Sequence, residues 1–160
     1  MSVAFRRESD EEHLEPKFEI PLPPGPNLVT ARGLALIQAK VAELEAQLPT
    51  QTDEAEITAL RRNLRYWRTR QATAQLAPLP TGETVEFGST VTYLLNGARR
   101  VTTIVGDDEA EPAAGLISFL APLSRALMSA EPGDLIAFGG KEDAIEIIAI
   151  GIGATDIARD

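Results

Sequence analysis

The fold is decided by residues 30–76, which read TARGLALIQAKVAELEAQLPTQTDEAEITALRRNLRYWRTRQATAQL. Apolar residues recur there at alternating steps of three and four positions, the heptad pattern of a helix that packs against another helix. They are Leu34, Ile37, Val41, Leu44 and Leu48 in the first half, and Ile57, Leu60, Leu64 and Trp67 in the second. The pattern predicts an antiparallel α-helical hairpin (coiled coil), with arms about 30 Å long at a rise of about 1.5 Å per residue.

The residues between the two halves predict where the chain turns. Pro49 cannot continue the first helix, and Asp53 is a favourable N-cap for the second. Glu56 follows three positions later, as in a capping box, and Glu54 adds another acid to the first turn. The tip of the hairpin is therefore acidic, and helix capping alone is enough to explain it.

The descending half of the hairpin is basic. Five arginines fall within ten residues with no acid among them: Arg61, Arg62, Arg65, Arg68 and Arg70. Arginines present only for solubility are usually interspersed with glutamates that form pairs at i,i+4. We therefore expect Arg61, Arg62, Arg65 and Arg68 to contact a polyanion, either RNA or an acidic protein surface, with a solvated flank as the alternative.

Composition excludes several classes of function. The chain has 160 residues, no cysteine and a single histidine, so disulfides and thiolate or histidine zinc sites are excluded. No apolar run is long enough for a bilayer, so we expect no membrane partner and a cytoplasmic protein. The formal net charge of −9 argues against sequence-specific or general DNA binding. Only residues 28–77 carry a basic excess, with seven basic and five acidic residues.

Five segments are expected along the chain. Residues 1–27 are acidic and proline-rich, which predicts a flexible arm. Residues 28–77 form the hairpin, residues 78–82 a proline-containing linker, residues 83–152 a folded C-terminal domain, and residues 153–160 a loose tail.

The C-terminal domain has the pattern of a β-rich fold with one helix. β-forming residues dominate from Val85 to Leu95, and Asn96-Gly97 is a strong hairpin signal. Further strands are predicted at residues 99–105, 116–120, 135–138 and 144–150, with a short helix at 122–128. The whole chain is thus predicted to be α+β, with one short helix on an antiparallel sheet.

Four motifs in this domain resemble the Gre family of bacterial transcript-cleavage factors, which enter the secondary channel of RNA polymerase. They are VEFGSTVT at 85–92, IVGDDEAEP at 104–112, GLIS at 115–118, and APLSRALM at 121–128 followed by Gly133-Asp134. The resemblance implies an FKBP-like C-terminal domain that docks on bacterial RNA polymerase, without prolyl isomerase activity. Docking is expected around the short helix, at Pro122, Leu123, Ser124 and Arg125, although Leu123 and Leu127 have the spacing of core residues.

The resemblance also implies a role for the tip. In the family the tip acids help the polymerase active site to hold a second Mg²⁺ and to orient water for hydrolysis of backtracked RNA. Asp53 and Glu56 would take this role, with Glu54 as a further metal ligand, close to the 3′ end of the nascent RNA. The chain itself would then be neither an enzyme nor the holder of a cofactor in isolation.

Two departures from the family leave the activity open. The hairpin is shorter by roughly ten residues per arm, or about 15 Å of reach, and Ile57 stands where the family has Asn. The alternative is a short-hairpin Gre-like regulator, of the kind once described as nucleoside diphosphate kinase regulators, which occupies the channel without cleavage. A coiled-coil adaptor unrelated to transcription is a third possibility, and only the heptad seam supports it.

Overall fold

The computed structural model describes residues 19–152, and the chain divides into two compact units. The helical unit contains Ile37–Thr73 together with the described residues up to Gly25. The sheet unit contains Pro26–Leu36 and the described residues from Ala74 onward. Most of the predicted N-terminal arm, residues 1–18, and the predicted tail, residues 153–160, lie outside the described residues.

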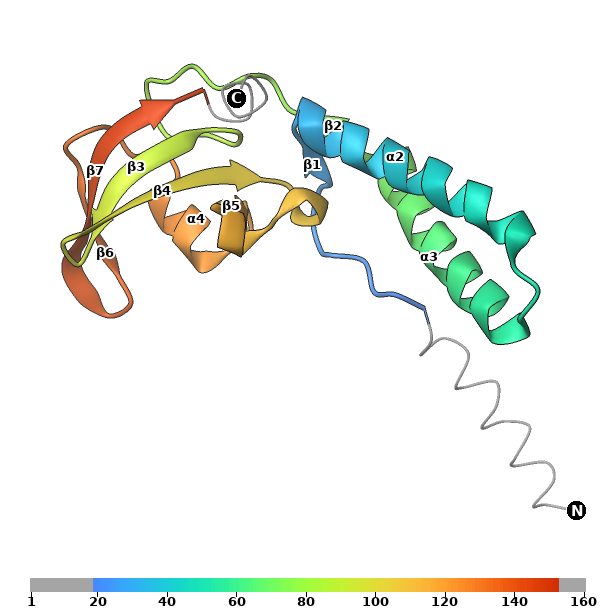
Figure 1. The fold of residues 1–160 in the computed structure, drawn as a ribbon. Coiled ribbons are helices and arrows are strands. Elements are labelled where there is room, and N and C mark those ends of the chain that lie inside the picture. Colours follow the sequence, from blue (N-terminus) through green and yellow to red (C-terminus); the bar gives the residue numbers. More distant parts are fainter. Residues whose placement is uncertain (1–18, 153–160) are drawn as a thin grey trace, which may run out of the picture. The chain divides into compact units, whose positions relative to one another are not determined.

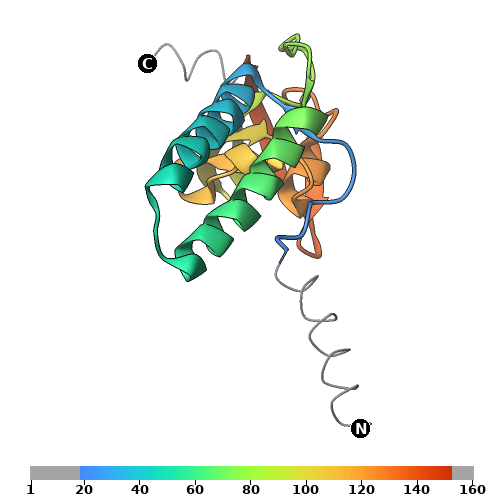
Figure 2. The same cartoon turned by 90° about the vertical axis from the view of Figure 1, so that its right-hand side faces the viewer.

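Most of helix α2 and the whole of helix α3 belong to the helical unit. Helix α2 spans Ala31–Gln47, helix α3 spans Glu54–Thr73, and a 3-10 turn, η1, joins them at Leu48–Thr50. The two helices lie side by side in both ribbon views (Figures 1 and 2). Their contact is formed by buried Val41, Leu44 and Leu64, with Leu48, Leu60 and Trp67 packed around them. In the described part of the chain, no helix is both long and apolar enough to cross a membrane.

The sheet unit is built on five strands in the order β5-β4-β3-β7-β6. Their bounds are Thr90–Leu95 (β3), Ala98–Val105 (β4), Leu116–Ser118 (β5), Leu135–Phe138 (β6) and Lys141–Gly151 (β7), and helix α4 spans Pro122–Leu127. The turn between β3 and β4 has positive φ at both Asn96 and Gly97, 51° and 87°, as its Asn-Gly sequence predicts. The predicted α+β class is confirmed.

One strand pairing differs from the predicted antiparallel sheet. Strand β5 pairs with β4 in parallel, so that Thr103 lies beside Leu116 and Val105 beside Ser118. The sheet is therefore mixed. Between β4 and β5 the chain passes through two 3-10 turns, η2 at Asp107–Glu109 and η3 at Pro112–Ala114, and then through Gly115 at φ 81°. This compact connection brings the chain back beside Thr103, so that β5 runs in the same direction as the end of β4, which a hairpin turn could not do.

The core of the sheet unit lies between one face of the sheet and α4. Val91 and Tyr93 of β3, Ile104 of β4, and Ile145 and Ile147 of β7 are buried together with Leu127 of α4. The hydroxyl of Tyr93 is 2.9 Å from the Thr102 hydroxyl, so its polar end is satisfied inside the core. The predicted core role of Leu127 is confirmed.

A small second sheet lies outside the predicted pattern. Strands β1, Leu28–Val29, and β2, Gln75–Leu76, pair in parallel, and two flanking backbone bonds extend the pairing, Gln75 N to Asn27 O and Ala77 N to Val29 O. Residues 28 and 29 and residues 75 and 76 were predicted to belong to the hairpin segment, 28–77. The compact units place both strands in the sheet unit, together with the first turn of α2.

A buried carboxylate attaches that first turn to the sheet unit. Glu109 is 5% exposed, and it accepts hydrogen bonds from the Thr30 hydroxyl at 2.6 Å and from Arg32 Nη1 at 2.9 Å. The Thr30 hydroxyl in turn accepts from the Gly33 amide at 3.0 Å, so Thr30 is the N-cap of α2. We call Glu109, Thr30 and Arg32 the Glu109 clamp.

Two glycines give the backbone room to approach at the clamp. A Cβ on Gly33 would lie 2.8 Å from Glu109 Oε1, and a Cβ on Gly106 would lie 2.3 Å from the Leu28 carbonyl oxygen. Real Cβ atoms do not approach so closely. Only glycine at position 106 therefore allows the close packing of η2 against β1, and a side chain at position 33 would push against the Glu109 carboxylate.

We predict that Glu109→Ala lowers the free energy of unfolding by about 2 kcal/mol, because it removes two charge-assisted hydrogen bonds from a buried site. Urea denaturation followed by circular dichroism measures the loss. Glu111→Ala is the matched control, since Glu111 is exposed, and a change within about 0.5 kcal/mol is expected for it. Equal effects of the two substitutions would contradict the clamp.

Candidate functional site

The acidic tip is formed by the turn between η1 and α3. The Asp53 carboxylate accepts a hydrogen bond from the Glu56 amide at 3.1 Å, and the Asp53 carbonyl accepts the first helical bond, from Ile57 N at 3.0 Å. Asp53 is therefore the N-cap of α3, as predicted. Glu54 and Glu56 lie in the first turn, where their charges favour the helix dipole. All three side chains are exposed.

The tip carboxylates do not form a metal site by themselves. Among residues 19–152, no group of three or more acidic or histidine side chains is arranged to hold a metal ion. In addition, one oxygen of Asp53 is engaged in capping α3. A Mg²⁺ ion prefers an octahedral shell of oxygen ligands. An ion at this tip would therefore need most of its ligands from another molecule.

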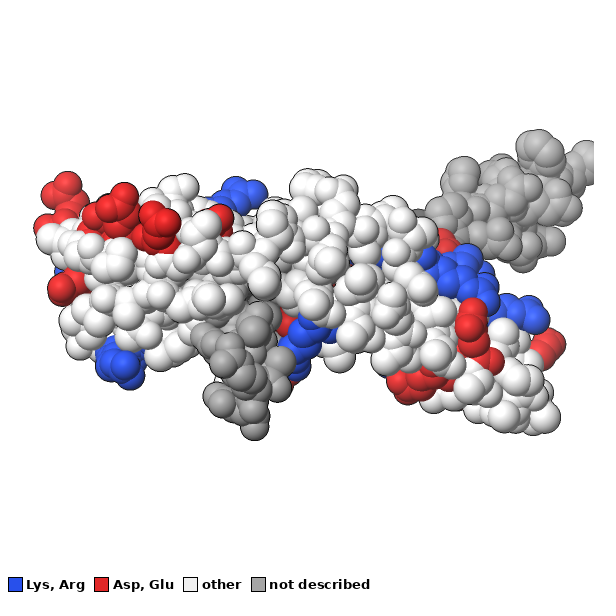
Figure 3. All heavy atoms as spheres, turned by 90° about the horizontal axis from the view of Figure 1, so that it is seen from above, with Lys and Arg blue, Asp and Glu red and all other residues white. Residues whose placement is uncertain are grey.

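Two of the predicted anion-binding arginines already have acidic partners within the helical unit. Arg65 pairs with Glu19, which precedes the helices, and Arg68 Nη2 lies 2.8 Å from Glu45 Oε2 on α2. Arg61 is exposed and Arg62 is half-buried. Figure 3 shows basic side chains next to acidic ones over the helices. The absence of acids between residues 61 and 70 therefore did not mean an absence of acidic partners, because these come from 20 or more positions away.

A fifth arginine has an environment that its sequence does not reveal. Arg70 is only 3% exposed, and its guanidinium carbon lies 6.0 Å from the centre of the Tyr66 ring. The Tyr66 ring packs edge-on against Trp67, with ring centres 5.1 Å apart. Arginine readily stacks on aromatic faces because its planar cation is weakly hydrated. Arg70 therefore belongs to the packed part of the chain.

The predicted docking residues on α4 face in different directions. Pro122 and Arg125 are exposed, whereas Leu123 packs against the core of the sheet unit. Ser124 is fully buried, and its hydroxyl donates to the Ser118 carbonyl at 2.7 Å. Ser124 thus holds α4 on β5 and has no surface to offer a partner. Within this segment, only Pro122 and Arg125 remain candidates for direct contact.

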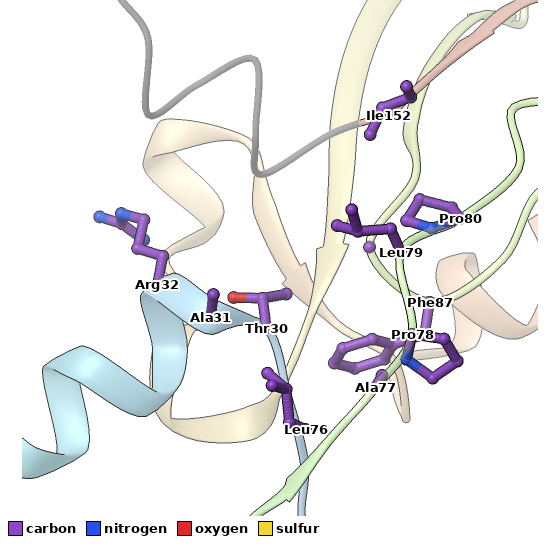
Figure 4. Close-up of a pocket in the computed structure, with 11 residues that line it drawn as sticks. Thr30, Ala31, Arg32, Leu76, Ala77, Pro78, Leu79, Pro80, Phe87 and Ile152 are labelled. Atoms are coloured by element: carbon purple, nitrogen blue, oxygen red, sulfur yellow. The ribbon is translucent and has the colours of Figure 1, made fainter.

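A cavity in the sheet unit is apolar and contains none of the predicted site residues. It measures about 540 Å³ and lies between the start of α2, the linker and the segment before β3. Figure 4 shows Leu76, Leu79, Pro80, Phe87 and Ile152 around it. Its charged residue, Arg32, donates to Glu109 in the clamp. The cavity therefore offers apolar contact and no acid–base chemistry.

Comparison with known proteins identifies the sheet unit. Residues 80–151 match the family model for the C-terminal domain of the transcription elongation factors GreA and GreB. This range contains the five-stranded sheet and α4, so this part of the sheet unit is similar to the GreA/GreB C-terminal domain. The predicted resemblance to the Gre family is confirmed.

The relatives by sequence are elongation factors. GreA of Desulfovibrio desulfuricans is 40% identical over 78 residues, which is 46% of this chain and 48% of that protein. GreA of Nitratidesulfovibrio vulgaris strain DP4 is 35% identical over 97 residues, or 57% of this chain and 60% of that protein. The chain spans about half the length of the curated relatives it matches.

Solved structures of Gre-type factors also match, at lower similarity. The crystal structure of Thermus aquaticus Gfh1 is 19% identical, with 79% of this chain and 98% of that chain covered and a TM-score of 0.38. The GreA/GreB factor of Nitrosomonas europaea is 20% identical, with 80% and 99% covered and the same TM-score. These TM-scores are too low to compare the arrangement of the whole chain.

We predict that Asp53→Ala destabilises α3 by about 1 kcal/mol, because it removes the side-chain cap. Asp53→Asn should leave the stability nearly unchanged, since Asn caps as well as Asp. Thermal unfolding of the three proteins, followed by helical circular dichroism, measures the difference. An Asp53→Ala protein as stable as the parent would show that the cap contributes nothing. The Asn variant then separates the charge of residue 53 from its capping role.

Proposed function

We propose that the protein is a transcription elongation factor that binds RNA polymerase and acts from the secondary channel on paused or backtracked complexes. The observation that carries this proposal is the GreA/GreB C-terminal domain at residues 80–151. The domain would have the FKBP-like architecture of the family and would dock on the polymerase, with Pro122 and Arg125 of α4 as the exposed candidates for contact.

The helical unit would be the part that enters the channel. We infer that α2 and α3 form a Gre-type antiparallel coiled-coil hairpin whose acidic tip points towards the polymerase active site. Their lengths of 17 and 20 residues correspond to about 26 and 30 Å. The arginines of α3 would run alongside the nascent RNA or an acidic channel wall, where Arg61, Arg62, Arg65 and Arg68 could pair with phosphates or carboxylates.

The chemistry at the tip would be supplied jointly with the polymerase. Asp53 and Glu56, with Glu54 beside them, would complete the shell of a Mg²⁺ ion shared with the polymerase active site or orient the attacking water. A second metal stabilises both the entering and the leaving oxygen of a phosphodiester. The protein would thus stimulate the nuclease activity of the polymerase without being an enzyme itself.

A second function is favoured by one feature of the helical unit. The arms are short for the family, and the tip has Ile57 after its acids where the family has Asn. Such a tip would stop before the metal, and geometry decides this chemistry. In that case the protein would occupy the channel without promoting cleavage.

Cleavage of stalled elongation complexes distinguishes the two functions. For the cleavage factor, we expect the protein to release short RNA from backtracked complexes. The pair Asp53→Asn and Glu56→Gln should abolish release while α3 stays capped. Glu83→Gln with Glu142→Gln, which removes two exposed acids of the sheet unit, is the charge-matched control and should retain activity. No release at saturating protein, with binding intact, would establish the channel occupant instead.

The proposed role of α3 predicts a charge-dependent association. We expect Arg61→Glu with Arg62→Glu to weaken binding to backtracked complexes and to flatten its dependence on salt, because fewer ion pairs form. Arg99→Glu with Arg100→Glu makes the same change of net charge on exposed residues of β4 and should have a smaller effect. Unchanged binding by the α3 variant would mean that these arginines are only a solvated flank.

A further inference from the structure

A shallow cavity on α3 already contains a carboxylate from another part of the chain. It measures about 250 Å³ and is lined by Arg62, Arg65, Tyr66 and Thr69 of α3, with Glu19 and Ile20 from the segment before β1. The four α3 residues are spaced at i, i+3, i+4 and i+7, so they share one face of the helix. We call this face the Arg65 site.

Glu19 occupies the Arg65 site as a ligand would. Arg65 donates two hydrogen bonds to it, from Nε to Oε1 at 2.9 Å and from Nη2 to Oε2 at 2.5 Å. This is the bidentate geometry in which a guanidinium binds an oxyanion. The hydrogen bonds from Arg65 lower the pKa of Glu19, and the positive charge of Arg62 lowers it further. The carboxylate is thus held in its charged form by two arginines.

Glu19 can be replaced at the Arg65 site by another anion. The side chains of Arg65 and Glu19 are 56% and 48% exposed, and an ion pair this open to water contributes little to stability. A phosphodiester carries two free oxygens that match the same guanidinium fork. Tyr66 lines the same cavity and is half-buried. The part of its ring that Arg70 and Trp67 leave open offers a contact for a base, as in proteins that bind single-stranded nucleic acid through cations and aromatic rings together. An acidic peptide would use only the cations.

We propose that the Arg65 site binds a phosphate of single-stranded RNA, and that Glu19 stands in for this phosphate in the free protein and competes with it. The inference rests on the proposed function only in that α3 is placed next to RNA. RNA must displace Glu19 from Arg65 in order to bind. The apparent affinity for RNA is therefore lower, to the extent that Glu19 already fills the site in the free protein.

Binding of a short fluorescein-labelled oligouridine to the full chain, measured by fluorescence anisotropy, tests the competition. We expect Glu19→Gln to bind about 2- to 5-fold more tightly than the parent, the range that the loss of an exposed ion pair allows. Glu43→Gln removes the same charge from an exposed position on α2 and is the control for net charge. Its affinity should change by less than that of Glu19→Gln.

A second background tests whether Glu19 acts through Arg65. In an Arg65→Gln protein, Glu19→Gln should give no gain, because the shared site no longer exists. The competition is overturned if Glu19→Gln binds no more tightly than the parent or than Glu43→Gln, or if the gain persists without Arg65. If polyglutamate binds the Glu19→Gln protein and the oligouridine does not, the assignment to RNA is wrong.

The outcome is separable from that of the proposed function. Association of the parent protein with RNA polymerase is measured independently by co-sedimentation. A gain in RNA affinity without polymerase association would support the Arg65 site and contradict the elongation factor. Polymerase association with no gain from Glu19→Gln would do the opposite.

Discussion

The Glu109 carboxylate is the constraint that holds the first turn of α2 within the sheet unit. An ionised carboxylate can be buried only if hydrogen bonds replace its water, and the Thr30 hydroxyl and Arg32 supply them. These partners come from residues 79 and 77 positions away. They tie the cap and first turn of α2 to η2 in the sheet unit.

Local features of the fold could be predicted, because they depend on neighbours in the sequence. Asp53 caps α3 as expected, and Asn96-Gly97 makes the predicted turn. Features that depend on residues far apart in the sequence could not be predicted. No pattern within residues 104–118 reveals that β5 returns parallel to β4, and strands of two residues such as β1 and β2 are too short to have a period.

Some features of the candidate site could also be predicted from the sequence, and others could not. The acidic tip and the basic α3 are visible in the sequence, but the pairs Arg65–Glu19 and Arg68–Glu45 are not, because their acids lie outside the window in which helical pairs form. Ser124 was expected at a docking surface and is buried instead. The sequence of a short helix does not reveal whether a polar residue such as Ser124 bonds to the neighbouring strand or faces a partner. In the proposed function, Arg65 and Arg68 would have to exchange these acidic partners for a polyanion.

The central question is whether the acidic tip reaches the active site of RNA polymerase. Because the chain has no cysteine, Thr52→Cys places one thiol on an exposed residue beside Asp53. An iron chelate on this thiol generates hydroxyl radicals that cut whatever lies close to the tip. In a backtracked elongation complex, we predict cuts near the 3′ end of the nascent RNA and in the catalytic loops of the polymerase. Cuts confined to the outer surface of the polymerase, or none at all, would show that the tip does not reach the active site.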